Sequence, residues 1–428
     1  MSELRLRYDW VDYASRDHAW IMPTFAQLSI DIDDQNVTRV LDKRSRTTRD
    51  KIVTPLYPLV EWILANWWTL FYEAAVPSRG ILVKDYLSRH SFREAREGYA
   101  YPDLRIYPEG EWTKVEWYPQ ISAHQRVEFL NGGMARVSTS ELKQLLVDLV
   151  DAVLARLDQF GIVDSWAHQE WRAINDVDPD EKAFCRSVAY LGLDPFELDA
   201  GTSGTVIAAI GGIPVPVRDE LLQAVTAATL VDSAAWLSAG LQAIGSTPTT
   251  TSKWSWVRDR VGAVSSSSFP WELGYQLAQT ARTSLNLNDA TPAEITELLH
   301  EVSPIVQASK PPIGTLDAVA GFGNGAPVCY TAKRRSDAQR FASARGLSEF
   351  LLGNEGPLLL SSAETGRQQR GRAFAAEFLA PAAHIASHLS GDEIGKEEVE
   401  ELAAEFQVSS MVIEYQLTNH QLARIANE

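Results

Sequence analysis

The spacing of apolar residues changes once along this chain, near Ser138, and that change limits the folds open to it. Before Ser138, three segments alternate apolar and polar residues with the period of two that half-buried strands show. From Ser138 onward, apolar residues recur at helical spacing, starting with a Ser/Thr cap and a glutamate in the first turn. The chain is therefore predicted to be α+β, with a mixed α/β domain over residues 1–137 and a helical domain over 138–250. The three strand-like segments are LRLRYDW (4–10), FAQLSIDI (25–32) and EWTKVEWYP (111–119).

An aromatic-rich segment, LYPLVEWILANWWTLFYEA (56–74), has apolar residues at helical spacing and is predicted to be a helix. Its rings fit either an exposed binding stripe or a buried helix face. The buried face is favoured, because large aromatic rings mostly belong to protein cores. These rings are Trp62, Trp67, Trp68, Phe71 and Tyr72.

Two turns are predicted from their residues. RVEFLNGGMARVS (126–138) is expected to be a hairpin with Asn131 and Gly132 in the turn. GFGNG (321–325) has the glycines of a phosphate-binding loop but no following Lys-Ser/Thr pair, so a hairpin turn is the favoured interpretation.

A third domain is expected over residues 268–428, after two segments rich in small polar residues, GSTPTTTSK (245–253) and SSSSFP (265–270). Its pattern predicts mostly helices, together with a small sheet around AVAGFGNGAPVCYTA (318–332).

Composition excludes several classes of partner. The formal net charge is −17, and nucleic-acid binding depends largely on Lys and Arg neutralising phosphates, so direct nucleic-acid binding is not expected. The chain has only two cysteines, too few for a disulfide framework. The first residues lack the apolar core of a signal peptide, and no run of about twenty apolar residues could span a membrane. A cytoplasmic protein without a membrane partner is therefore expected.

Five segments of the third domain resemble, in order, segments of the ImmA/IrrE family of zinc metallopeptidases. The central one, RFASARGLSEFLLG (340–353), has the frame of the helix that carries the family's His-Glu-x-x-His motif. The resemblance implies a zincin-like fold for residues 268–428. The other four segments are PWELGYQLAQTAR (270–282), PVCYTA (327–332), GRAFAAEFLAP (371–381) and VEELAAEFQVSSMVIEYQL (399–417).

The residues that the family uses for chemistry are replaced in this chain. A zincin needs two histidines at i and i+4, a glutamate beside the first histidine, and a third ligand from a neighbouring helix. Aligning the frame places Arg345 and Glu349 at the histidine positions, Gly346 at the glutamate position, and Arg370 near the third-ligand position. A guanidinium stays protonated and cannot ligate a metal. No metal, cofactor or catalytic residue is therefore expected at these vacated positions.

Two hypotheses describe what the replaced side chains do. Arg345, Glu349 and Arg370 have alternating charges and could form an Arg–Glu–Arg cluster that joins the two helices. Its net effect on stability could be close to zero, because desolvation offsets the attraction. Alternatively, the three side chains simply reach solvent.

His384 and His388, in HIASH, have the i, i+4 spacing of zinc ligands. No glutamate follows His384, and the segment comes after Pro381 on an expected surface turn. We expect an exposed pair of histidines. The alternative is an active zinc endopeptidase with non-standard ligands that cleaves a repressor or an antitoxin.

The resemblance implies a function in bacterial stress response, toxin–antitoxin systems or phage defence. With the ligand positions vacated, the leading hypothesis is a catalytically inactive regulator or effector that acts through protein–protein contacts. The expected partner is a protein, such as a helix-turn-helix protein, toxin or antitoxin encoded by a neighbouring gene. The aromatic N-terminal domain is a candidate for contact with a second partner.

Overall fold

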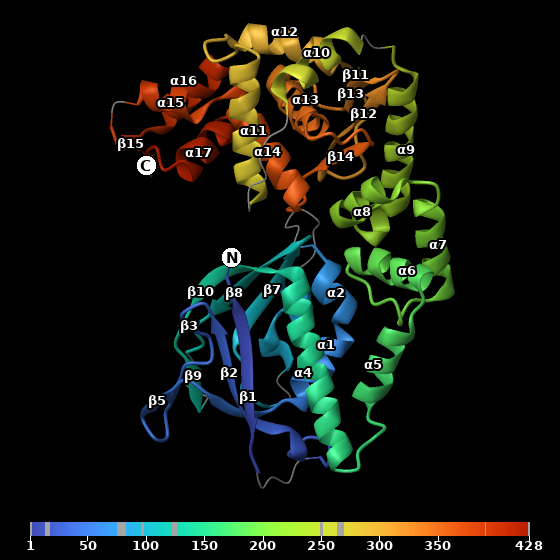
Figure 1. Ribbon diagram of the computed structural model, residues 1–428, viewed down its shortest axis with the longest axis vertical. Helices are drawn as coiled ribbons and strands as arrows, with labels where there is room; N and C mark the ends of the chain where they lie inside the picture. The colour runs from blue at the N-terminus through green and yellow to red at the C-terminus, as the bar shows by residue number, and fades with distance from the viewer. Residues whose placement is uncertain are drawn as a thin grey trace. The chain divides into compact units, whose positions relative to one another are not determined.

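In the computed structural model, small sheets near the N-terminus are followed by a largely helical middle (Figure 1). The structure describes residues 2–12, 18–74, 83–95, 98–121, 126–248, 251–262, 269–389 and 391–426. The chain is a mixed α+β protein, as the spacing of its apolar residues predicts. Its contacts divide it into two units, Met1–Ser203 and Gly204–Glu428, and each unit has its own hydrophobic core.

The strands of the first unit form three small antiparallel sheets, with orders β1-β2-β3 (β6 also pairs with β2), β10-β8-β7 and β5-β4-β9. β1 pairs with β2 along its whole length, from Leu4 opposite Ile32 to Trp10 opposite Ala26. The three predicted strands are confirmed as β1, β2 and β8. The strands are β1 (Leu4–Trp10), β2 (Phe25–Ile32), β3 (Gln35–Asn36), β4 (Val40–Asp42), β5 (Thr47–Arg49), β6 (Ile52–Pro55), β7 (Asp103–Glu109), β8 (Trp112–Tyr118), β9 (Val127–Phe129) and β10 (Gly133–Ser138).

Helix α4 (Thr139–Gln159) lies against β1, β8 and β10 of the first unit (Figure 1). The predicted cap is confirmed, because Ser138 Oγ accepts a hydrogen bond from the Glu141 N–H at 3.4 Å. The apolar face of α4 is buried in the same core as the strands. The other helices are η1 (Met22–Thr24), α1 (Tyr57–Ala65), α2 (Trp67–Tyr72), α3 (Val83–His90), η3 (Phe92–Ala95), α5 (Trp166–Asp176) and α6 (Pro179–Tyr190).

The aromatic-rich segment forms two helices, α1 and α2, which meet at Asn66. The Asn66 side-chain amide donates to the Trp62 carbonyl at 2.8 Å, a local bond of the kind that competes with continued helix. Trp62, Trp67, Trp68 and Phe71 are buried and Tyr72 is half-buried. The favoured interpretation of this segment as core is confirmed.

The predicted hairpin over residues 126–138 is wrong. β9 pairs with β4 and β10 pairs with β8, so the two strands belong to different sheets. Gly133 lies so close to the Trp117 ring that any Cβ would overlap it, and the Asn131 side chain donates to the Asn36 carbonyl at 2.8 Å. Long-range packing therefore determines the path of these residues, which the local turn sequence could not reveal.

The second unit contains one four-stranded sheet, of order β11-β13-β12-β14, and most of its remaining residues are helical. The predicted turn at residues 321–325 is confirmed, since β12 and β13 form a hairpin with Asn324 and Gly325 at positive φ. The strands are β11 (Ile305–Gln307), β12 (Leu316–Gly323), β13 (Ala326–Thr331), β14 (Leu358–Ser361), β15 (Glu393–Ile394) and β16 (Arg424–Ile425). The helices are α8 (Val215–Ala224), η4 (Ala227–Thr229), α9 (Leu230–Ser246), α10 (Thr251–Val261), α11 (Pro270–Ser284), α12 (Pro292–Val302), α13 (Ser336–Leu351), α14 (Gly366–Leu379), α15 (Ala382–His388), α16 (Lys396–Phe406) and α17 (Ser410–Asn419).

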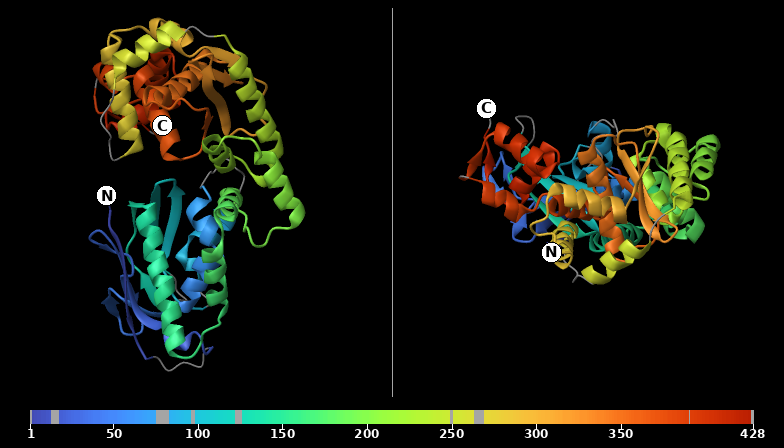
Figure 2. Two further views of the ribbon diagram at one scale, coloured as in Figure 1. Left: turned by 45° about the vertical axis from the view of Figure 1, so that its right-hand side comes forward. Right: turned by 90° about the horizontal axis from the view of Figure 1, so that it is seen from above.

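Helices α9 and α13 cover opposite faces of this sheet (Figures 1 and 2). A Cβ on Gly240 of α9 would lie 3.0 Å from the Val319 side chain, and one on Gly346 of α13 would lie 3.0 Å from Ala320 Cβ. Val319 and Ala320 are neighbours on β12, so their side chains point to opposite faces. On the α13 side, α14 packs against both α13 and α11.

The division between the units lies inside α7 (Ala200–Ile210). Residues 138–203 belong to the first unit, because α4 packs into the core of its sheets. The organisation into three domains stays a prediction. Among the described helices, none alone is long and apolar enough to cross a bilayer. α8 and the η4–α9 stretch meet the length and composition requirements only as a pair bent by 119°.

Candidate functional site

The three vacated positions on α13 lie in the interior of the second unit. Arg345 and Glu349, one helical turn apart, are 3% and 1% exposed. Gly346 faces β12 at the close contact with Ala320, so a longer side chain there would meet the sheet. The hypothesis that these side chains reach solvent is therefore wrong for Arg345 and Glu349.

Glu349 forms a two-point ion pair with Arg370 of α14. Arg370 Nε lies 2.8 Å from Glu349 Oε1, and Arg370 Nη2 lies 2.9 Å from Oε2. Parallel bonds of this kind are among the strongest side-chain contacts. This pair joins the two helices that the resemblance places around a metal, and it uses both oxygens of the carboxylate.

Among the described residues, the ion-pair partner of Arg345 is Asp317 and not Glu349, so the Arg–Glu–Arg hypothesis holds for only one of its two arginines. Arg345 Nη1 donates to Asp317 Oδ2 at 2.9 Å, and its Nη2 donates to the Ser361 carbonyl at 2.7 Å and to Gln368 Oε1. Lys333 Nζ lies 2.8 Å from the other oxygen of Asp317. Burial alone would raise the pKa of Asp317, but the charges of Arg345 and Lys333 outweigh it and hold this pKa below its usual value.

The second arginine near Glu349 is Arg367, on the first turn of α14. Arg367 Nε lies 3.6 Å from Glu349 Oε2, and Arg367 Nη1 lies 3.4 Å from Glu220 Oε1 on α8. Glu220, Glu349, Arg367 and Arg370 form the carboxylate–guanidinium cluster. Burial raises the pKa of Glu220 to about 7, because the nearby positive charge of Arg367 compensates only in part.

Side chains also occupy the outer edge of β14. The Glu220 carboxylate accepts from the Leu359 N–H at 3.1 Å. The Gln368 carboxamide donates to the Leu359 carbonyl at 2.6 Å and accepts from the Ser361 N–H at 3.1 Å. The Ser361 carbonyl is taken by Arg345. Gln368 and its neighbours thus satisfy the groups that an adjacent strand would otherwise bind.

The histidine pair does not form a ligand pair. His388 is exposed at the end of α15, where its Nδ1 contacts the His384 carbonyl at 2.8 Å and its Nε2 lies 3.0 Å from Glu405. His384 is half-buried rather than exposed. Within the described ranges, no three His, Cys, Asp or Glu side chains are placed to hold a metal ion.

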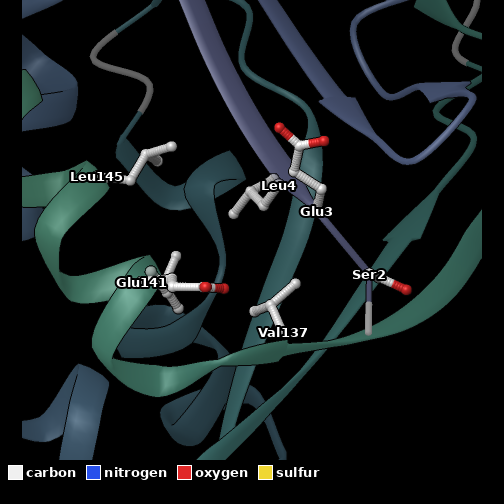
Figure 3. A pocket seen from close by; sticks show the side chains of 7 residues that line it. Ser2, Glu3, Leu4, Val137, Glu141 and Leu145 are labelled. Carbon is white, nitrogen blue, oxygen red and sulfur yellow. The ribbon is translucent and has the colours of Figure 1, made fainter.

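A surface pocket of about 350 Å³ lies in the first unit, between the start of β1 and α4 (Figure 3). Leu4, Val137 and Leu145 supply apolar walls, and Glu3 and Glu141 add exposed carboxylates. It contains none of the predicted site residues.

Sequence reasoning missed Glu220, Asp317, Arg367 and Gln368. Glu220 and Asp317 are distant in the chain from the helix they contact, so no spacing could reveal them. Arg367 lies three residues before Arg370, and helical spacing alone could have placed both on one face.

Chemically, the arrangement can cross-link helices. Its guanidinium groups stay protonated, and the Glu349 carboxylate is held by Arg367, Arg370 and the Asn354 side-chain amide. No protein-family model matches the sequence, and no curated protein matches it either.

Proposed function

We propose that this chain is a catalytically inactive, ImmA/IrrE-like regulator or effector that acts through protein–protein contacts. The observation that carries the proposal is the ion pair between Glu349 and Arg370, where the resemblance would require metal ligands. The order of elements on the α13 side of the sheet, a strand pair followed by helix, strand and helix, supports the zincin-like part of the proposal.

The partner is a protein of a bacterial stress-response, toxin–antitoxin or phage-defence system, such as a helix-turn-helix protein or toxin from a neighbouring gene. The formal charge of −17 supports a protein partner over nucleic acid. Because side chains satisfy the β14 edge, a partner at this site would bind through side-chain contacts rather than as an added strand.

Metal content and peptidase activity, measured together on protein purified without chelators or added metal, test this proposal. We expect neither stoichiometric zinc nor metal-dependent hydrolysis of unfolded protein substrates. About one zinc per chain, lost together with hydrolysis in His384→Ala, would establish the enzyme instead. Glu297→Gln, at an exposed residue of α12, is the matched control.

A further inference from the structure

The second unit contains a group of charges that do not balance. Lys333, Arg345 and Arg372, the cationic cluster, lie near two carboxylates, Asp317 and Glu364. Asp317 uses one oxygen for Lys333 and the other for Arg345. Three cations and two anions leave one positive charge in excess, in a chain whose formal net charge is −17.

Arg372, on α14, has no carboxylate within ion-pair distance in the part of the chain that the structure describes. Its Nη1 donates to the Ala363 carbonyl at 3.0 Å and lies 3.5 Å from the Ser361 carbonyl. The same Ser361 carbonyl accepts from Arg345 Nη2 at 2.7 Å. Two guanidinium groups therefore converge on one carbonyl oxygen, which neutralises neither of them.

Burial, followed by the charge of Arg345, lowers the pKa of Arg372 to about 10. Arg345 is 3% exposed, and its Nε has no hydrogen-bond partner among the described residues. A half-buried cation without an ion-paired carboxylate is costly, and a bound anion would neutralise it.

We infer that the cationic cluster binds a small oxyanion, the carboxylate or phosphate group of a ligand. Arg372 supplies the guanidinium that lacks an ion pair, Arg345 adds a buried positive charge, and Lys333 is 41% exposed. Tyr415 of α17, which is 57% exposed, lies near enough to affect the pKa of Arg372 and marks the solvent side. This site shares Arg345 with the vacated positions but does not depend on the absence of catalysis.

Calorimetric titration of the full chain with inorganic phosphate, at constant ionic strength, tests the phosphate source. Titration with N-acetyl-alanyl-alanine, compared with its C-terminal amide, tests the carboxylate source. Saturable binding of either oxyanion, with none for the amide, supports the site and identifies its ligand chemistry. Arg372→Gln should weaken that binding about tenfold or more, whereas Arg335→Gln, at an exposed arginine just before α13, should leave it unchanged.

Two results would overturn the inference. One is the lack of saturable binding by both anions; the other is equal binding by the wild type and Arg372→Gln. If Arg372→Gln does not fold, Lys333→Gln replaces it, because that side chain is 41% exposed. Folding stability without added anion provides a second readout. Arg372→Gln should be as stable as the wild type or more stable, and a large loss would also overturn the inference, because it would mean that the protein already compensates this charge.

Discussion

At the scale of single residues, Glu220 should make stability depend on pH. Its pKa is raised from 4.5 to about 7 by burial, so ionisation is penalised in the folded state. The stabilising contribution is complete below pH 4.5 and is lost as the pH rises through 7. Relative to the wild type, Glu220→Gln should therefore gain roughly 2–3 kcal/mol in free energy of unfolding between pH 5 and pH 8.5.

Urea unfolding of both proteins at the two pH values measures this difference. Glu297→Gln, at an exposed glutamate, is the control and should have the same free energy of unfolding as the wild type at both pH values. If the difference in free energy of unfolding between Glu220→Gln and the wild type is the same at both pH values, Glu220 does not titrate as a buried acid.

Also at this scale, sequence reasoning selected Arg345, Glu349 and Arg370 correctly as interacting positions but paired Arg345 with the wrong carboxylate. Arg345 meets Asp317, a residue on β12 that no local pattern connects to α13. Charge alternation can indicate that buried charges exist, but the tertiary fold selects their partners.

At the scale of elements, the pair Glu349–Arg370 should hold α13 against α14. Glu349→Ala leaves Arg370 without its counter-ion, whereas Arg367 keeps Glu220, and it should cost about 3–5 kcal/mol of stability. The double variant Glu349→Leu/Arg370→Met should cost much less, because no buried charge is left unpaired. A double-mutant cycle of Glu349→Leu, Arg370→Met and the double variant, measured by urea unfolding, gives the coupling between the two side chains. The pair Arg335–Asp337, whose arginine is 79% exposed, is the control and should couple by at most about 1 kcal/mol.

The β14 edge gives a second prediction at this scale. Gln368→Ala removes the acceptor for the Ser361 N–H, so that amide should exchange with solvent about tenfold faster or more. The Leu360 amide, which faces β12, serves as the internal reference. Gln369→Ala, whose side chain bonds an exposed carbonyl, should leave both amides unchanged. Equal exchange in all three proteins would show that Gln368 does not protect the edge.

At the scale of the whole molecule, two separate cores predict two unfolding transitions in calorimetry. Leu146→Ala removes a fully buried side chain from the first core, and Leu347→Ala does the same in the second. Each variant should lower the temperature of one transition, by the equivalent of about 2–5 kcal/mol of stability, and leave the temperature of the other unchanged. A single transition that both variants shift equally would mean that the chain unfolds as one unit.

The sequence predicted the elements of this molecule better than their grouping. The period of two identified β1, β2 and β8, and the cap at Ser138 identified the start of α4, since both signals are local. The failed hairpin at residues 126–138 and the assignment of α4 to the first unit depend on packing between distant segments. Such packing leaves no periodic signal in the residues concerned.

The central claim is that ion pairs rather than a metal join α13 to α14. The most direct test is the free energy of unfolding of the purified wild type in EDTA and in excess zinc. A metal bound only by the folded state would stabilise it in proportion to the logarithm of metal concentration. We predict equal stability within about 0.5 kcal/mol under both conditions. A loss of several kcal/mol in EDTA, restored by zinc, would contradict the account.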